Sequence, residues 1–278
     1  MEYYRKPKKR KKRRHVTKRF LVLLDVVLVG VLIFASWKLI DTLVGYYRAE
    51  KTYDAIAESV VQTAAPVQAT AVPAPQSTAE PVYVPSEVPI AVDFEKLRKE
   101  NKDVIGWLYS TATPINYPIL QTDDNEYYLT RDFHREKSSG GALYFDFRNN
   151  VSAPDENLIL YGHRMKDDSM FGSLVDYINE PYAKEHPKMY LLTEGQNYRV
   201  EIFACRTVRA TSLHYFETVF YDDASYQGYL DKALEQSYWK APFAVDTTYP
   251  TLTMVTCSTY GHADDPRLLV HGRLIPVN

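Results

Sequence analysis

One apolar stretch, residues 20–37, constrains most strongly what this chain can fold into. It contains a single charged residue, Asp25, among eighteen positions. Eighteen helical residues extend for about 27 Å, close to the ~30 Å hydrocarbon core of a membrane. Trp37 and Lys38, at its end, suit the membrane–water interface. We therefore expect residues 20–40 to form an N-terminal transmembrane anchor. A cleaved signal peptide is the alternative, but no Ala-x-Ala-like site closely follows and the stretch is long for one.

Charge is distributed unevenly on the two sides of this stretch. The first nineteen residues carry eleven Lys and Arg and one acid, Glu2, whereas the rest of the chain carries 22 basic and 34 acidic residues. Because basic flanks stay in the cytoplasm, residues 1–19 are expected to be a cytoplasmic arm and the acidic body to lie outside the cell. Basic arms can also bind nucleic acid. A topology signal is sufficient to explain this one, so we expect a membrane partner and no nucleic acid.

A segment of biased composition separates the apolar stretch from the body. Residues 46–63 could form a short helix, and residues 64–92 contain six prolines and no glycine. Such a composition cannot build a core and predicts an extended linker. We expect residues 41–92 to be a helix followed by a Pro/Ala-rich extracellular spacer. The body, residues 93–278, is long enough for one domain with its own core.

The body is rich in short strand-like runs. These runs contain many Val, Ile, Leu, Tyr and Phe residues and are bounded by Asp, Asn, Pro and Gly. Helical patterns are few, near residues 94–101, 169–177 and 224–239. About eight strands with few helices predict a mainly β fold, a closed or nearly closed β-barrel with helical insertions. The expected strands are residues 104–109, 115–120, 142–147, 157–161, 188–193, 198–208, 252–257 and 268–275.

Two cysteines occur, Cys205 and Cys257. In an exported protein a pair suggests a disulfide. Cys205 lies inside a core strand, where a free cysteine behaves as a small apolar residue. Cys257 ends a strand, where a thiol could face a cleft, although a buried strand cysteine is the commoner case. A thiol becomes a useful nucleophile when a nearby cation or acid/base group adjusts its protonation. Arg267 opens the next strand and His163 ends another apolar run, so both could serve Cys257.

Other histidines compete with His163. His271 lies within the last expected strand and is interpreted as structural. His262 is in a polar loop five residues from Cys257 and could approach it. The sequence has no His-Glu-x-x-His pair, Cys-x-x-Cys pair, Gly-rich phosphate loop or Gly-x-Ser-x-Gly elbow, so we expect neither a metal site nor a cofactor nor an α/β-hydrolase. The remaining histidines, His134, His186 and His214, are interpreted as surface loop residues.

Three segments together resemble class B sortases. The first is TLTMVTC at residues 251–257, followed after ten residues by Arg267, which resembles the family's Cys…Arg signature. The second is NKDVIGWL at residues 101–108, continuing through INYPILQ at 115–121. The third is LYGHRMKDDSMFG at residues 160–172. A long helical insert before the cysteine strand is also similar to that class. The resemblance extends over nearly all of residues 93–278.

The resemblance implies a membrane-anchored cysteine transpeptidase with a sortase-like eight-stranded barrel. Cys257 would be the nucleophile, His163 the general acid/base, and Arg267 the group that stabilises the oxyanion or holds the substrate. The enzyme would cleave a C-terminal sorting motif of exported proteins after Thr and join the acyl group to a peptidoglycan amine at the outer face of the cell membrane. Residues expected in the substrate groove are Asn125, Leu129, Tyr215 and Thr256.

One position departs from the family pattern, and two other functions stay open. Class B enzymes often have Ser two residues before the cysteine, where this chain has Val255, so any substrate contact through that hydroxyl is lost. A cysteine endopeptidase of the same fold would release proteins instead of attaching them. A non-catalytic wall-binding scaffold would not depend on Cys257 at all.

Overall fold

The computed structural model describes residues 18–64, 67–68, 83–84, 87–257 and 265–277. The chain divides into two compact units, Met1–Gly45 and Tyr46–Asn278. One helix, α1 (Lys18–Val60), begins in the first unit and continues into the second. It covers the expected anchor at residues 20–40 and most of the helix expected to continue from it at residues 46–63. Its apolar side chains between Phe20 and Val44 are exposed. Among the described residues it is the one helix long and apolar enough to cross a membrane, a judgement from length and composition alone.

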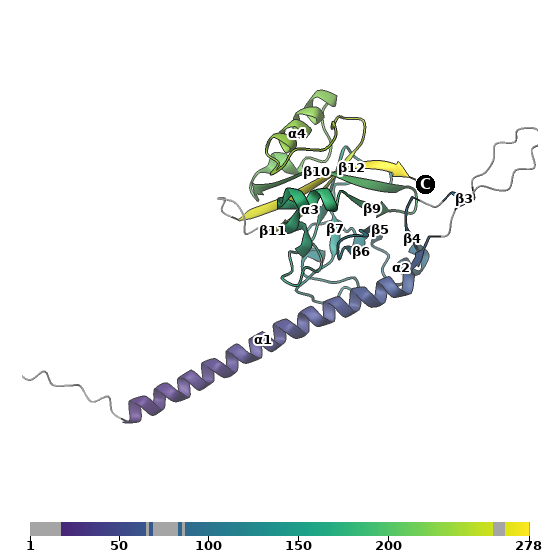
Figure 1. The fold of residues 1–278 in the computed structure, drawn as a ribbon. Helices are drawn as coiled ribbons and strands as arrows, with labels where there is room; N and C mark the ends of the chain where they lie inside the picture. The colour runs from purple at the N-terminus through teal and green to yellow at the C-terminus, as the bar shows by residue number, and fades with distance from the viewer. Residues whose placement is uncertain (1–17, 65–66, 69–82, 85–86, 258–264, 278) are drawn as a thin grey trace, which may run out of the picture. The chain divides into compact units, whose positions relative to one another are not determined.

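The second unit is built on a closed barrel of eight strands (Figure 1). Around the barrel the order is β10-β12-β11-β8-β7-β6-β5-β9. The expected closed eight-stranded barrel is therefore confirmed. The strands are β5 (Val104–Tyr109), β6 (Asn116–Leu120), β7 (Leu143–Phe145), β8 (Asn157–Tyr161), β9 (Lys188–Leu192), β10 (Asn197–Arg209), β11 (Thr251–Cys257) and β12 (Pro266–Val277).

Two neighbouring pairs in the barrel are parallel, β6 with β7 and β8 with β11, and the other pairs are antiparallel. β10 and β12 pair along almost their whole length, with one register shift between Ile202 and Ala204. The core of this unit is filled by large apolar side chains, including the fully buried Trp107.

The core of the second unit includes residues before position 93. Tyr53, Ile56 and Val60 of α1 are buried in it, as are Val88 and Ile90. A short strand after α1, β1 (Val61–Thr63), pairs with β4 (Ile90–Val92). β2 (Val67–Gln68) pairs with β3 (Tyr83–Val84). The folded unit thus begins at Tyr46, and part of the segment expected to be a spacer contributes to its core.

The helices lie between strands and close parts of the barrel surface. α2 (Phe94–Glu100) begins after Asp93, whose side chain accepts a hydrogen bond from Lys96 N at 2.8 Å. The helix expected at 169–177 is the 3-10 helix η2 (Gly172–Ile178), which leads into the short α3 (Glu180–Glu185). Two further 3-10 helices are η1 (Tyr127–Leu129) and η3 (Leu213–Phe216).

The helical insert before the cysteine strand is α4 (Asp223–Glu235), which lies over β10 and β12 (Figure 1). Its first turn is capped by reciprocal hydrogen bonds between Asp222 and Ser225. It ends at Glu235, four residues before Trp239, where the helix was expected to end. The Trp239 ring N–H donates to Tyr177 O at 2.7 Å.

Candidate active site

The parallel pair β8 and β11 brings His163 and Cys257 to one edge of the barrel. Val255 pairs with Tyr161, and the N–H of Gly162 donates to Val255 O at 3.1 Å. His163 and Cys257 each lie two residues beyond that last pair. Because parallel strands end at the same edge of a sheet, the two side chains are placed there by the backbone register.

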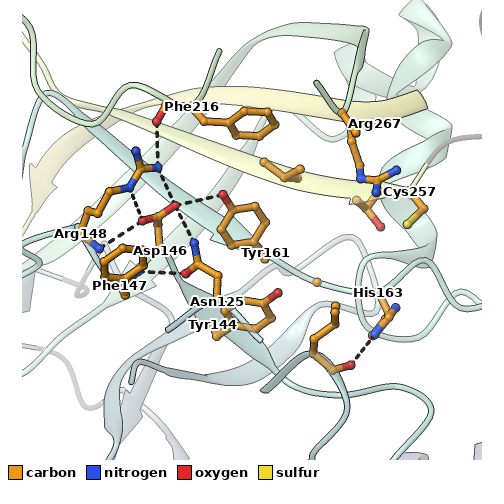
Figure 2. A pocket seen from close by; sticks show the side chains of 15 residues that line it. Asn125, Tyr144, Asp146, Phe147, Arg148, Tyr161, His163, Phe216, Cys257 and Arg267 are labelled. Atoms are coloured by element: carbon orange, nitrogen blue, oxygen red, sulfur yellow. Dashed lines mark hydrogen bonds and ion pairs between the residues drawn. The ribbon is translucent and has the colours of Figure 1, made fainter. Parts of the chain in front are cut away.

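Arg267 is placed by the other neighbour of β11. It is the direct cross-strand partner of Cys257 in the antiparallel pair β11–β12, where directly opposed residues lie close together. The Arg267 side chain is 26% exposed, and Cys257 is exposed. Both line a cleft of about 670 Å³ together with His163. Figure 2 shows these three residues at one end of that cleft.

The His163 ring is oriented by a main-chain carbonyl. Its Nε2 lies 2.6 Å from Leu129 O. A carbonyl oxygen only accepts, so Nε2 carries a proton and Nδ1 is the nitrogen left for acid/base work. Within the described part of the chain no hydrogen bond joins this ring to the Cys257 thiol. Such bonds are often long before a substrate is bound, so the arrangement is compatible with proton transfer through a bound substrate.

The Arg267 guanidinium is held by Asp265, which sequence reasoning missed. Nη1 donates to Oδ1, and Nη2 donates to Oδ2 at 3.0 Å. The hydrogen bond from Arg267 lowers the pKa of the Asp265 carboxyl, and the bond to Asp265 raises the pKa of Arg267 against the opposing effect of its burial. The Cys257 sulfur also raises the pKa of Arg267 electrostatically. Two-point contact with Asp265 therefore restricts the planar group that faces the thiol.

The other end of the cleft is organised by Asp146, a second residue that the sequence did not indicate. Asp146 is fully buried and accepts from Arg148 Nε at 2.7 Å and Nη2 at 2.8 Å, from Asn125 Nδ2 at 3.0 Å and from the Tyr161 hydroxyl at 3.0 Å. Burial raises the pKa of this carboxyl, but the hydrogen bonds and charge of Arg148 outweigh that effect and hold it below its usual value. The network fixes Asn125 and Tyr161, which line the cleft (Figure 2).

The structure brings three of the four expected groove residues to the cleft. Asn125, Leu129 and Thr256 line it. Thr256 is buried, and its Oγ1 has no hydrogen-bond partner among the described residues. Tyr215 does not line it. That residue is buried behind Val255, with its hydroxyl donating to Gln236 Oε1 at 3.0 Å.

The competing residues are placed away from the cleft chemistry. His271 is fully buried within β12, and burial lowers its pKa well below the usual value, as a structural histidine requires. Both cysteines are free, and burial raises the pKa of the Cys205 thiol. His262 lies outside the described residues. In the described part of the chain no group of three or more His, Cys, Asp or Glu side chains is placed to hold a metal ion.

Comparison with known proteins finds relatives along most of the chain. A family model described as the sortase domain matches residues 108–275. Sortase B of Listeria monocytogenes is 32% identical over 252 residues, which cover 91% of this chain and 95% of that protein. The crystal structure of sortase B from B. anthracis in complex with AAEK1 is 32% identical with a TM-score of 0.67, covering 84% of this chain and 99% of that one.

A complex of Staphylococcus aureus sortase B with its substrate is also 32% identical, with a TM-score of 0.62, covering 66% of this chain and 85% of that one. The matched region of the family model contains the whole cleft from Asn125 to Arg267.

Proposed function

Because this chain belongs to the sortase family, as a class B sortase-type cysteine transpeptidase, we propose that Cys257, His163 and Arg267 are its catalytic residues. One observation carries the proposal. A thiol, an imidazole and a guanidinium from three adjacent strands open into one cleft. A nucleophile, an acid/base group and a planar cation are the three functions that acyl transfer through a thioester needs.

In the proposed first step, Cys257 Sγ attacks the carbonyl carbon of a Thr residue in a C-terminal sorting motif of another exported protein. His163 takes the thiol proton, the C–S bond forms, and the C–N bond to the following residue breaks. His163 then gives that proton to the leaving amine. The product is a thioacyl enzyme.

In the second step, an amine of a peptidoglycan precursor attacks the thioester. His163 accepts the proton of the attacking amine, the C–S bond breaks, and the proton returns to Cys257. An amide bond then joins the protein to the cell wall. The sequence of proton transfers balances without a cofactor or a metal ion.

Arg267 is proposed to donate hydrogen bonds to the oxyanion that forms in both steps, or to the substrate backbone. A charged planar donor in a partly buried site is suited to developing negative charge. The two-point contact with Asp265 supports this role because it limits reorientation of the guanidinium during the reaction.

The peptide is proposed to lie along the cleft between Cys257 and Asn125. Two observations support this placement: Thr256 Oγ1 is buried with no hydrogen-bond partner among the described residues, and the Leu129 side chain is 42% exposed. Val255 stands where class B enzymes often have Ser, so this chain has no hydroxyl at that point of the cleft wall. The structure of S. aureus sortase B with its substrate supports substrate binding to the same barrel in this chain.

We also propose that the enzyme is a single-pass membrane protein. Residues 20–40 would span the membrane, residues 1–19 would remain in the cytoplasm, and the catalytic unit would face outward. The length and apolar character of α1 and the basic residues before it support this topology.

The test uses the full chain in detergent, a set of Thr-containing peptides and triglycine as the amine, followed by mass spectrometry. We expect an acyl adduct on Cys257 and a peptide–triglycine product, both abolished in Cys257→Ala. Cys205→Ala is the matched control and should retain both, because that thiol is buried. An adduct on Cys205, or undiminished product from Cys257→Ala, would refute the assignment. Cleaved peptide that carries no triglycine, although triglycine is present, would instead indicate an endopeptidase.

A further inference from the structure

The last turns of α1 lie against the main chain at Gly140 and Gly141, next to His163. The Tyr53 hydroxyl donates to Gly141 O at 2.7 Å, and both groups are buried. Burial raises the pKa of this hydroxyl well above its usual value, so it remains a donor at all physiological pH values. Ala49 lies near Gly140 on the same side, and a side chain at Gly140 would contact its Cβ at 3.8 Å. One face of the helix therefore holds the chain at Gly140 and Gly141.

Gly141 in turn packs against the catalytic imidazole. Its φ is +56°, and a Cβ there would lie 3.1 Å from His163 Cδ2 and 2.8 Å from Leu129 O. The position has no room for a side chain, and its backbone conformation favours glycine. Leu129 O is the carbonyl that accepts the hydrogen bond from His163 Nε2–H. A displacement of Gly141 would thus disturb both the ring and the hydrogen bond that orients it.

A second path runs from the same tyrosine to the main chain of His163. The ring of Tyr53 packs edge-on against Tyr117 with centroids 5.3 Å apart. The Tyr117 hydroxyl accepts from the N–H of Met170 at 3.1 Å, and the N–H of the next residue, Phe171, donates to His163 O at 2.9 Å. Tyr53 therefore supports both the ring of His163, through Gly141, and the main chain of His163, through Tyr117.

We propose that Tyr53, on the helix that precedes the barrel, is a positioning residue for His163. The inference rests on the proposed catalytic role of His163 and deepens it. Tyr53 does not line the cleft, so its effect on His163 passes through its neighbours Gly141 and Tyr117. The helix segment after Tyr46 is then a part of the catalytic machinery as well as a support for the core.

The test compares Tyr53→Phe with Tyr226→Phe in the full chain in detergent. Both variants lose a buried tyrosine hydroxyl that donates to a main-chain carbonyl, at 2.7 Å in Tyr53 and at 3.0 Å to Tyr249 O in Tyr226. Tyr226 lies on α4 and contacts neither loop next to His163. We expect Tyr53→Phe to lower kcat about tenfold with KM within twofold, since a slightly misplaced acid/base group loses rate rather than substrate affinity. Tyr226→Phe should leave both constants unchanged.

A second readout does not depend on activity. In chain labelled with ¹⁵N-histidine, the ring resonance of His163, assigned by its loss in His163→Ala, should move in Tyr53→Phe and stay in place in Tyr226→Phe. Undiminished activity of His163→Ala would refute its catalytic role without touching this readout. An unmoved resonance together with normal kcat in Tyr53→Phe would overturn the positioning role, as would equal losses in both variants.

If Tyr53→Phe fails to fold, Tyr117→Phe takes its place. It removes the acceptor of Met170 N–H and interrupts the second path. The same fall in kcat and the same movement of the His163 resonance are expected. Wild-type values for both would overturn the proposal.

Discussion

The protonation state of His271 leads to a quantitative prediction about stability. Its Nε2 lies 3.1 Å from Arg206 Nε, and its Nδ1 lies 3.0 Å from Thr253 Oγ1. An arginine N–H can only donate, so Nε2 must accept and the ring is neutral, with its proton on Nδ1. Burial, and then the positive charge of Arg206, lower the pKa of His271 well below its usual value.

The sign of the effect follows from comparing the folded and unfolded states. An unfolded histidine binds a proton near pH 6.5, whereas the folded ring stays neutral at lower pH. Stability from this residue is therefore present in full above pH 6.5 and is lost as the pH falls. If the folded ring remains neutral to pH 5, the free energy of unfolding drops by about 2 kcal/mol between pH 7.5 and pH 5, with a slope approaching 1.4 kcal/mol per pH unit.

The groups around His271 do not cancel this effect. Arg206 is fully buried and keeps its charge between pH 5 and pH 7.5. Burial raises the pKa of Tyr229, so this residue does not titrate between those pH values either. The assay is urea unfolding of the full chain in detergent at pH 7.5 and pH 5, in wild type, His271→Gln and His134→Gln. Acidic residues contribute equally to the pH dependence of the free energy of unfolding in all three proteins. Differences between the proteins therefore report the contribution of the substituted histidine.

We expect the loss between the two pH values to be about 2 kcal/mol smaller in His271→Gln than in wild type. His134, which is exposed, serves as the control, and its variant should follow wild type. The same loss of stability in His271→Gln and wild type would refute the reasoning.

Two further predictions concern the cleft and the start of the folded unit. Arg267→Lys keeps the charge but loses the planar group that binds both oxygens of Asp265. We therefore expect kcat/KM to fall at least about tenfold. A kcat/KM within twofold of wild type in a peptide assay would contradict this. A chain that begins at Asp93 loses five buried apolar side chains of the core, each worth about 1.5–3 kcal/mol, which together rival the whole stability of a domain. Circular dichroism and gel filtration should show that this truncated chain aggregates or remains unfolded. A chain that begins at Tyr46 should fold. A folded, active chain that begins at Asp93 would disprove the structural role of α1.

The sequence predicted the barrel well because each strand carries its own signal. β5 and β8 begin and end where their apolar and aromatic residues meet turn-forming residues. The ends of β12 were not predictable in this way. That strand extends from Pro266 to Val277, past the expected 268–275, because its length is set by pairing with β10 rather than by its own residues. Tertiary pairing decides such boundaries, and local patterns do not contain it.

The candidate site was predictable only as far as strand ends and family resemblance reach. Cys257 and His163 stand at the ends of apolar runs, which is a local signal. Asp265 and Asp146 gave no such signal, since an acidic residue in a loop or next to a strand is normally solvated. Tyr53 is 88 residues before the carbonyl that it binds, so only the folded structure shows the contact.

The three cleft residues are held in position by different kinds of structure. Cys257 and Arg267 are opposed within a paired ladder, so main-chain hydrogen bonds of the barrel keep them together. His163 lies beyond the last pair of β8 and depends on contacts from other segments, namely Leu129 O and the packing of Gly141. His163, the proposed acid/base group, is consequently the member of the candidate site that substitutions outside the barrel can displace without moving Cys257. The helix before the barrel reaches His163 through the hydroxyl and the ring of Tyr53, so we expect changes there to affect proton transfer before they affect substrate binding.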